Sequence, residues 1–137
     1  MYWNNLHKIS KALEMKFKDR NELIFDKNFY EKLLQKNPGY VEAMSNLAEI
    51  YTKLGDFEKG LDMDILISKQ TPNDPIVHYN LACSYSLTGK IILARDSLMK
   101  SIQLGYQDFA YILNDSDLEN LRNHVEFGKI KSILIEK

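Results

Sequence analysis

Apolar side chains recur along much of this chain at the three- and four-residue spacing of an amphipathic helix. Leu47, Tyr51 and Leu54 follow that spacing in one segment, and Leu81 and Tyr85 follow it in another. Positions at this interval line one face of a helix, and that face is stable only when it is buried against a neighbour. The pattern therefore predicts short helices that pack against one another.

The pattern also repeats when the chain is shifted by thirty-four residues. The run Asn-Leu-Ala-x-x-Tyr at 46–51 recurs at 80–85, and Gly55 falls on Gly89 without a gap. Glycine adopts the left-handed backbone that ends a helix at little cost, and Asn21 fills the same position one step earlier. We expect three units, each a pair of antiparallel helices, over residues 7–40, 41–74 and 75–108.

With proline closing the first two units, this spacing resembles the tetratricopeptide repeat over residues 7–108. The resemblance implies an all-α fold, a right-handed α-solenoid of antiparallel helix pairs, with small residues where paired helices approach. Glu14 and Asp26 replace small residues in the first unit, and Asp64 replaces an aromatic residue in the second. The second helix of the middle unit is accordingly either rotated or locally polar.

The C-terminal segment, 109–137, resembles an end-piece that often follows bacterial repeats of this kind. It is expected to cover the apolar face of the last repeat, which the end of a solenoid would otherwise expose. The whole chain, 1–137, then forms a single domain. We predict in this segment a short helix near 107–113, a turn capped by Asp115 or Asp117, and a last helix near 124–136.

Composition narrows the classes of function. The chain has 137 residues, 45% of them apolar and 27% charged, with a net charge of -1, so it has no general attraction for nucleic acid. No apolar stretch is long enough to span a bilayer, and the first residues lack the pattern of a signal peptide. The lone Cys83 fits a reducing compartment. We therefore predict a cytoplasmic location and no membrane insertion.

No catalytic pattern stands out in the sequence. The histidines lie far apart, and the glycines are isolated helix terminators that form no phosphate-binding loop. Asp115 and Asp117 are either helix caps or a carboxylate pair for a metal. Cys83 has no basic neighbour on its helix that would activate its thiol. We predict no enzymatic activity, no cofactor and no metal.

The resemblance places a concave groove on the first helices of successive units. Asn46 and Asn80 are the strongest candidates there, because an amide both donates to and accepts from the backbone of an extended peptide. Alternatively, asparagine merely tolerates a half-exposed position. Tyr79 is either a groove contact or a residue that packs against the C-terminal segment. The predicted groove residues are Lys11, Met15, Glu42, Ser45, Asn46, Glu49, Lys53, Ile76, Tyr79, Asn80 and Cys83.

We interpret the chain as a non-catalytic interaction module or scaffold that binds a protein, as a peptide or a helix, in this groove. One alternative is a secretion-type or assembly chaperone for a specific client. Another is a homo-oligomer whose groove holds the aromatic N-terminal residues of a neighbour. Residues 1–36 carry a net charge of +3 and residues 37–74 carry -4, an asymmetry that would orient a charged partner.

Overall fold

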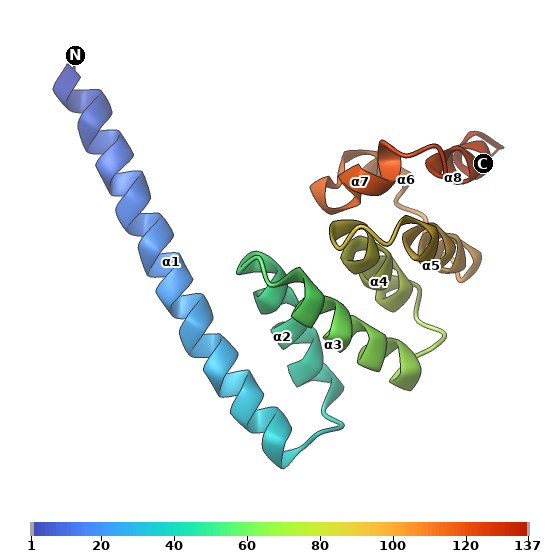
Figure 1. Cartoon of the computed structure of the whole chain (residues 1–137), viewed down its shortest axis with the longest axis horizontal. Coiled ribbons are helices and arrows are strands. Elements are labelled where there is room, and N and C mark those ends of the chain that lie inside the picture. Colours follow the sequence, from blue (N-terminus) through green and yellow to red (C-terminus); the bar gives the residue numbers. More distant parts are fainter. Residues whose placement is uncertain (1, 137) are drawn as a thin grey trace.

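The computed structural model describes residues 2–136, with side chains over residues 19–135. The chain begins with the long helix α1 (Tyr2–Lys36), and no strand occurs within the described residues (Figure 1). Then follow α2 (Val41–Lys53), α3 (Phe57–Gln70), α4 (Pro75–Leu87) and α5 (Ile91–Gln103). The chain ends in α6 (Phe109–Asn114), the 3-10 helix η1 (Ser116–Leu118), α7 (Glu119–Arg122) and α8 (Phe127–Glu136). These helices pack in tandem, and the predicted all-α solenoid is confirmed.

Two antiparallel helix pairs, α2 with α3 and α4 with α5, form the centre of the solenoid. Gly55 and Gly89 separate the helices of each pair with left-handed φ angles of 83° and 75°, as the sequence predicts. Gly60 of α3 lies so close to α2 that a Cβ atom there would be 2.9 Å from the Thr52 Oγ1 atom. Its counterpart in the next pair, Ala94, is fully buried. Small side chains thus set the close approach of the paired helices.

The helix pair predicted for residues 7–40 is wrong, because α1 runs without a break through Asn21. No described residue other than glycine adopts a positive φ angle, so Asn21 is not a helix terminator. A fold-back would also place Glu14 and Asp26 at the positions where Ala48 and Gly60 meet in the next pair. Two carboxylates are costly at such a contact, whereas continuing the helix adds backbone hydrogen bonds.

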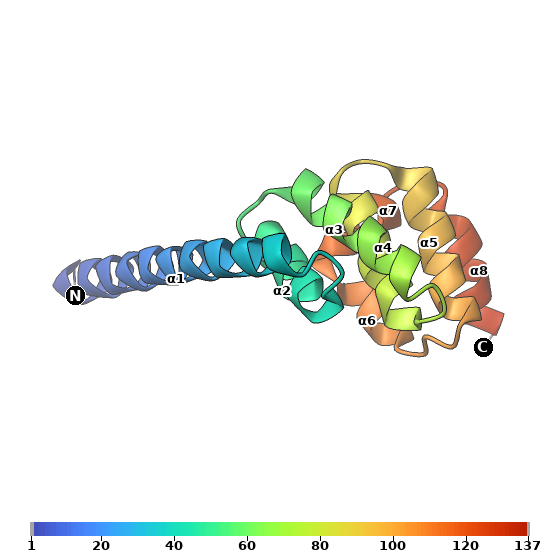
Figure 2. The same cartoon turned by 90° about the horizontal axis from the view of Figure 1, so that it is seen from below.

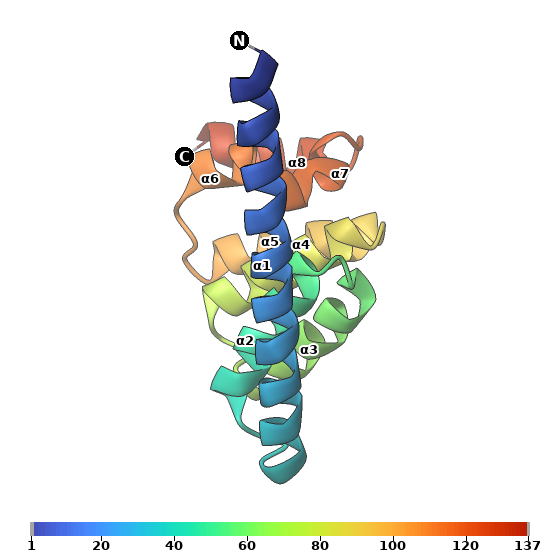
Figure 3. The same ribbon diagram turned by 90° about the vertical axis from the view of Figure 1, so that its left-hand side faces the viewer.

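The consequence is visible in the overall shape. The second half of α1 lies along α2, and its first half extends away from the other helices (Figures 1 and 2). Figure 3 views the molecule from the side of α1, which lies in front of the other helices. The Tyr51 hydroxyl of α2 donates a 2.7 Å hydrogen bond to Glu31 Oε1 and joins the two helices. On the outer side of α1, the side chains of Phe25 and Phe29 remain 74% and 56% exposed.

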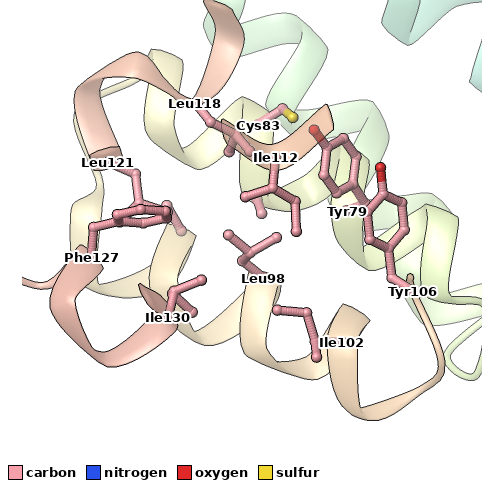
Figure 4. Close-up of a cluster of buried hydrophobic side chains, with 12 residues drawn as sticks. Tyr79, Cys83, Leu98, Ile102, Tyr106, Ile112, Leu118, Leu121, Phe127 and Ile130 are labelled. Atoms are coloured by element: carbon pink, nitrogen blue, oxygen red, sulfur yellow. The ribbon is translucent and has the colours of Figure 1, made fainter. Parts of the chain in front are cut away.

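The largest buried cluster lies between the α4/α5 pair and the C-terminal elements (Figure 4). Leu98 of α5 is fully buried there against residues of α6, η1, α7 and α8. The Ser86 hydroxyl of α4 accepts a 3.1 Å hydrogen bond from the Leu121 backbone N–H, and the Asn120 amide donates to the Ser86 carbonyl oxygen. The C-terminal elements therefore cover the end of the solenoid through both apolar and polar contacts.

Asp64 settles the open question about the second helix of the middle unit. Helix α3 continues regularly through this residue, so the helix is locally polar. The Asp64 side chain is only 8% exposed, and its Oδ2 atom accepts a 2.5 Å hydrogen bond from the Ser84 hydroxyl of α4. Burial raises the pKa of the Asp64 carboxyl to about 6, although the bond from Ser84 opposes this shift. One carboxylate thus links two neighbouring helix pairs.

Candidate functional site

A hollow of about 540 Å³ opens between α2, α4 and the C-terminal elements. Helices α2 and α4 supply its long walls, because each is the first helix of its pair and presents one face to the same side. The segment from Tyr106 to Asp117 closes the far end, where it turns back over α4. We call this hollow the groove.

Most of the residues predicted for the groove do line it. Eight of the eleven are found there: Ser45, Asn46, Glu49, Lys53, Ile76, Tyr79, Asn80 and Cys83. Glu42 does not line the groove, and its carboxylate accepts a 3.3 Å hydrogen bond from the Tyr40 hydroxyl instead. The side chains of Lys11 and Met15 lie outside the part of the chain whose side chains are described.

Two groove amides are available to a partner. Asn80 is exposed and Asn46 is half-buried, and both project from the first helix of a pair. Within residues 19–135, neither side-chain amide makes a hydrogen bond to another residue. Beside them the apolar side chains of Ile76 and Tyr111 are each 53% exposed. The groove therefore offers polar groups for a peptide backbone next to apolar contacts for side chains.

Tyr79 is part of the groove wall and is not an exposed contact. Its ring stacks on that of Tyr106 with 4.4 Å between centroids (Figure 4). The centroid of its ring lies 5.9 Å from that of Tyr111. Its hydroxyl donates a 2.7 Å hydrogen bond to Asp115 Oδ2, and the side chain is only 4% exposed. Burial and this bond raise the pKa of Tyr79 strongly. Tyr79 therefore packs against the C-terminal segment, which is one of the alternatives that the sequence leaves open.

Asp115 holds the local structure together at the far end of the groove. Its Oδ1 atom accepts a 3.0 Å hydrogen bond from the Asp117 backbone N–H and so caps η1, while its Oδ2 atom faces Tyr79 and the Cys83 thiol. Burial and the nearby carboxylates raise the pKa of Cys83 well above its usual value. The thiol therefore stays protonated at neutral pH, which makes it a poor nucleophile.

Sequence reasoning did not place three further residues in the groove. Tyr106, Tyr111 and Asp117 line the groove next to Asp64 of α3. Tyr111 and Asp117 lie beyond the third unit, and Tyr106 stands 34 residues after Pro72, so the repeat pattern gives no signal for these side chains. Only the assignment of an end-piece that folds over the last repeat points to this face.

Two comparisons with known proteins bear on the family. Models described as tetratricopeptide repeat match residues 27–82 and 76–104. The chain is similar to a protein of Arabidopsis thaliana whose name describes it as chloroplastic, with 34% identity over 83 residues that cover 58% of this chain and 25% of that protein. It is also similar to "Uncharacterized protein ycf37" of Pyropia yezoensis, with 57% identity over 35 residues that cover 26% of this chain and 20% of that protein. The matches thus span a quarter or less of these relatives.

Proposed function

Because this chain belongs to the tetratricopeptide repeat family, we propose that it is a non-catalytic interaction module that binds an extended segment of another protein in the groove. The observation that carries this proposal is a pair of side-chain amides, those of Asn46 and Asn80, that make no hydrogen bond to another residue within 19–135. They lie on the first helices of two neighbouring helix pairs. An extended peptide presents backbone donors and acceptors along its length, and paired amides can bind them without regard to sequence. Ile76 and Tyr111 add the apolar contacts that give such a peptide affinity.

Self-association is retained as the alternative to binding another protein. Self-association is favoured by the first half of α1, which extends away from the other helices, and by the exposed Phe25 and Phe29. The cytoplasmic location stays a prediction. The name of the Arabidopsis relative gives the chloroplast as the alternative compartment.

The role of the amides is testable with a peptide selected for binding from a random display library. Replacing both Asn46 and Asn80 by alanine is expected to lower the affinity for that peptide about tenfold or more, because each lost hydrogen bond is worth about 1 kcal/mol. Fluorescence polarisation with the labelled peptide measures the change.

The matched control replaces two exposed amides elsewhere, Asn28→Ala with Asn73→Ala, and should leave the affinity unchanged. Equal affinity for the Asn46→Ala/Asn80→Ala protein would contradict the proposal. Failure of the library to yield any binding peptide would contradict it as well.

A further inference from the structure

The groove has an excess of negative charge that nothing in the described chain balances. Four carboxylates line it, those of Glu49, Asp64, Asp115 and Asp117, against the single ammonium group of Lys53. Lys53 pairs with Glu49 at 2.9 Å, on the exposed side of α2. Within residues 19–135, no ion pair reaches the other three carboxylates. Their negative potential is therefore directed into the hollow.

Arg122, at the far end of the groove, is used for a different purpose. The guanidinium of Arg122 donates hydrogen bonds to the backbone carbonyl oxygens of Ile112 and Asp115, so it fixes the turn between α6 and η1. Burial and the neighbouring Asp115 raise the pKa of Asp117. Burial disfavours the charged form of this carboxyl first, and the like charge of Asp115 adds to the effect.

Asp64 is the most deeply buried of these four carboxylates. Its side chain is more than nine-tenths buried and yet lines the hollow. The Ser84 hydroxyl is the one side chain within the described residues that donates to it, and that bond uses only Oδ2. A carboxylate has room for several donors, so Asp64 retains acceptor capacity toward the hollow. Apolar packing would not require a charged residue at this position.

Three tyrosine rings, which we call the tyrosine wall, adjoin these carboxylates. Tyr79, Tyr106 and Tyr111 form a continuous set of rings beside Asp115, and Tyr111 is half exposed. Tyr79 and Tyr106 stack on each other and are buried, so Tyr111 is the ring of this set that can attract the cationic end of lysine or arginine and pack against its apolar stem. The tyrosine wall and the carboxylates thus lie on adjoining sides of the groove.

We propose that the partner segment carries a lysine or arginine whose cationic end enters the groove between Asp64 and Asp117, with its stem against Tyr111. This inference rests on the proposed function and adds the chemistry of the partner to it. The choice between an acidic, a neutral and a basic segment then follows from charge, since a buried carboxylate gains most from a hydrogen-bonded cation.

The test uses pools of short, otherwise neutral random peptides with one central position fixed as arginine, lysine, leucine, glutamine or glutamate. Fluorescence polarisation with the full chain gives an affinity for each pool. The arginine and lysine pools are expected to bind about tenfold more tightly than the glutamine pool, with the glutamate pool weakest. Added salt should reduce that preference.

Variants assign the preference to the two carboxylates. Asp64→Asn with Asp117→Asn should reduce the advantage of the basic pools to about twofold or less, because the shape is kept while the charge is removed. Asp62→Asn with Glu119→Gln removes the same charge from exposed positions outside the groove and should preserve the advantage.

The outcomes separate this inference from the function on which it rests. Equal binding of all pools, weakened by Asn46→Ala with Asn80→Ala, would overturn the cationic preference and leave the peptide groove standing. Tightest binding of the glutamate pool would have the same meaning. Absence of binding by every pool would count against both.

Discussion

Replacing Ile112 by alanine is expected to lower the free energy of unfolding by about 3 kcal/mol. Ile112 is fully buried on the short helix α6, where it packs into the cluster that joins α4 and α5 to the C-terminal elements (Figure 4). Removing most of this side chain takes away apolar contacts and leaves a cavity that rigid neighbours fill only in part. Urea denaturation followed by far-ultraviolet circular dichroism measures the loss.

The next residue provides a matched control for this change. Leu113 lies on the same helix and is 49% exposed, so Leu113→Ala should cost less than about 1 kcal/mol. The comparison separates the loss of core packing from the change in helix propensity, which is a small gain for both substitutions because alanine is the best helix former. Equal losses for the two variants would show that α6 does not pack as described.

Asp64→Asn is expected to stabilise the protein by about 1–3 kcal/mol at neutral pH. The pKa of the buried Asp64 carboxyl is raised from 3.8 to about 6, so the folded state binds its proton more tightly than the unfolded state does. Folding stability from this group is therefore present in full below about pH 4 and is lost as the pH rises toward 6. Asparagine still accepts the hydrogen bond from Ser84 and carries no charge to bury.

Urea titrations between acid and neutral pH compare wild type and variant. The advantage of Asp64→Asn should be near zero at about pH 4 and should grow until about pH 6. Asp62→Asn, at an exposed position on the same helix, should show no such growth. An advantage for Asp64→Asn that is constant across this range would contradict the burial of the charged group. A destabilised variant at neutral pH would contradict it too.

These effects of Asp64 point in opposite directions for stability and binding. Under the proposal, the charge of Asp64 lowers the folding stability and contributes to binding the cation of the partner. The same substitution should therefore stabilise the free protein and weaken the binding of the basic peptide pools. Asp64 links the core of the solenoid to its concave face.

Much of the fold follows directly from the spacing of residues. The register that aligns Gly55 with Gly89 predicts where two helix pairs turn, and both glycines adopt the left-handed backbone. The same register places Asn46 and Asn80 on the groove, because equivalent positions on successive first helices face the same side. Local periodicity is enough for these features, since each repeat contacts only its neighbours.

Other features depend on contacts that no local pattern records. At Asn21 the choice between a turn and a continuous helix depends on whether the two helices could pack, and Glu14 with Asp26 makes that packing unfavourable. The tyrosine wall depends on how the end-piece folds back over α4, which brings distant rings against Tyr79. The buried bond between Asp64 and Ser84 requires the rotation of α3 relative to α4 to be known.

The central claim is that this protein binds its partner in the concave groove, and NMR mapping of a bound peptide tests it most directly. A display-selected peptide is added to ¹⁵N-labelled protein, and amide chemical shifts are followed to saturation. The account predicts that the largest changes cluster at Asn46, Asn80 and Tyr111, on the groove. Changes centred on the outer face of α5, at the exposed Ile92 and Leu93, with the groove signals unmoved, would contradict it.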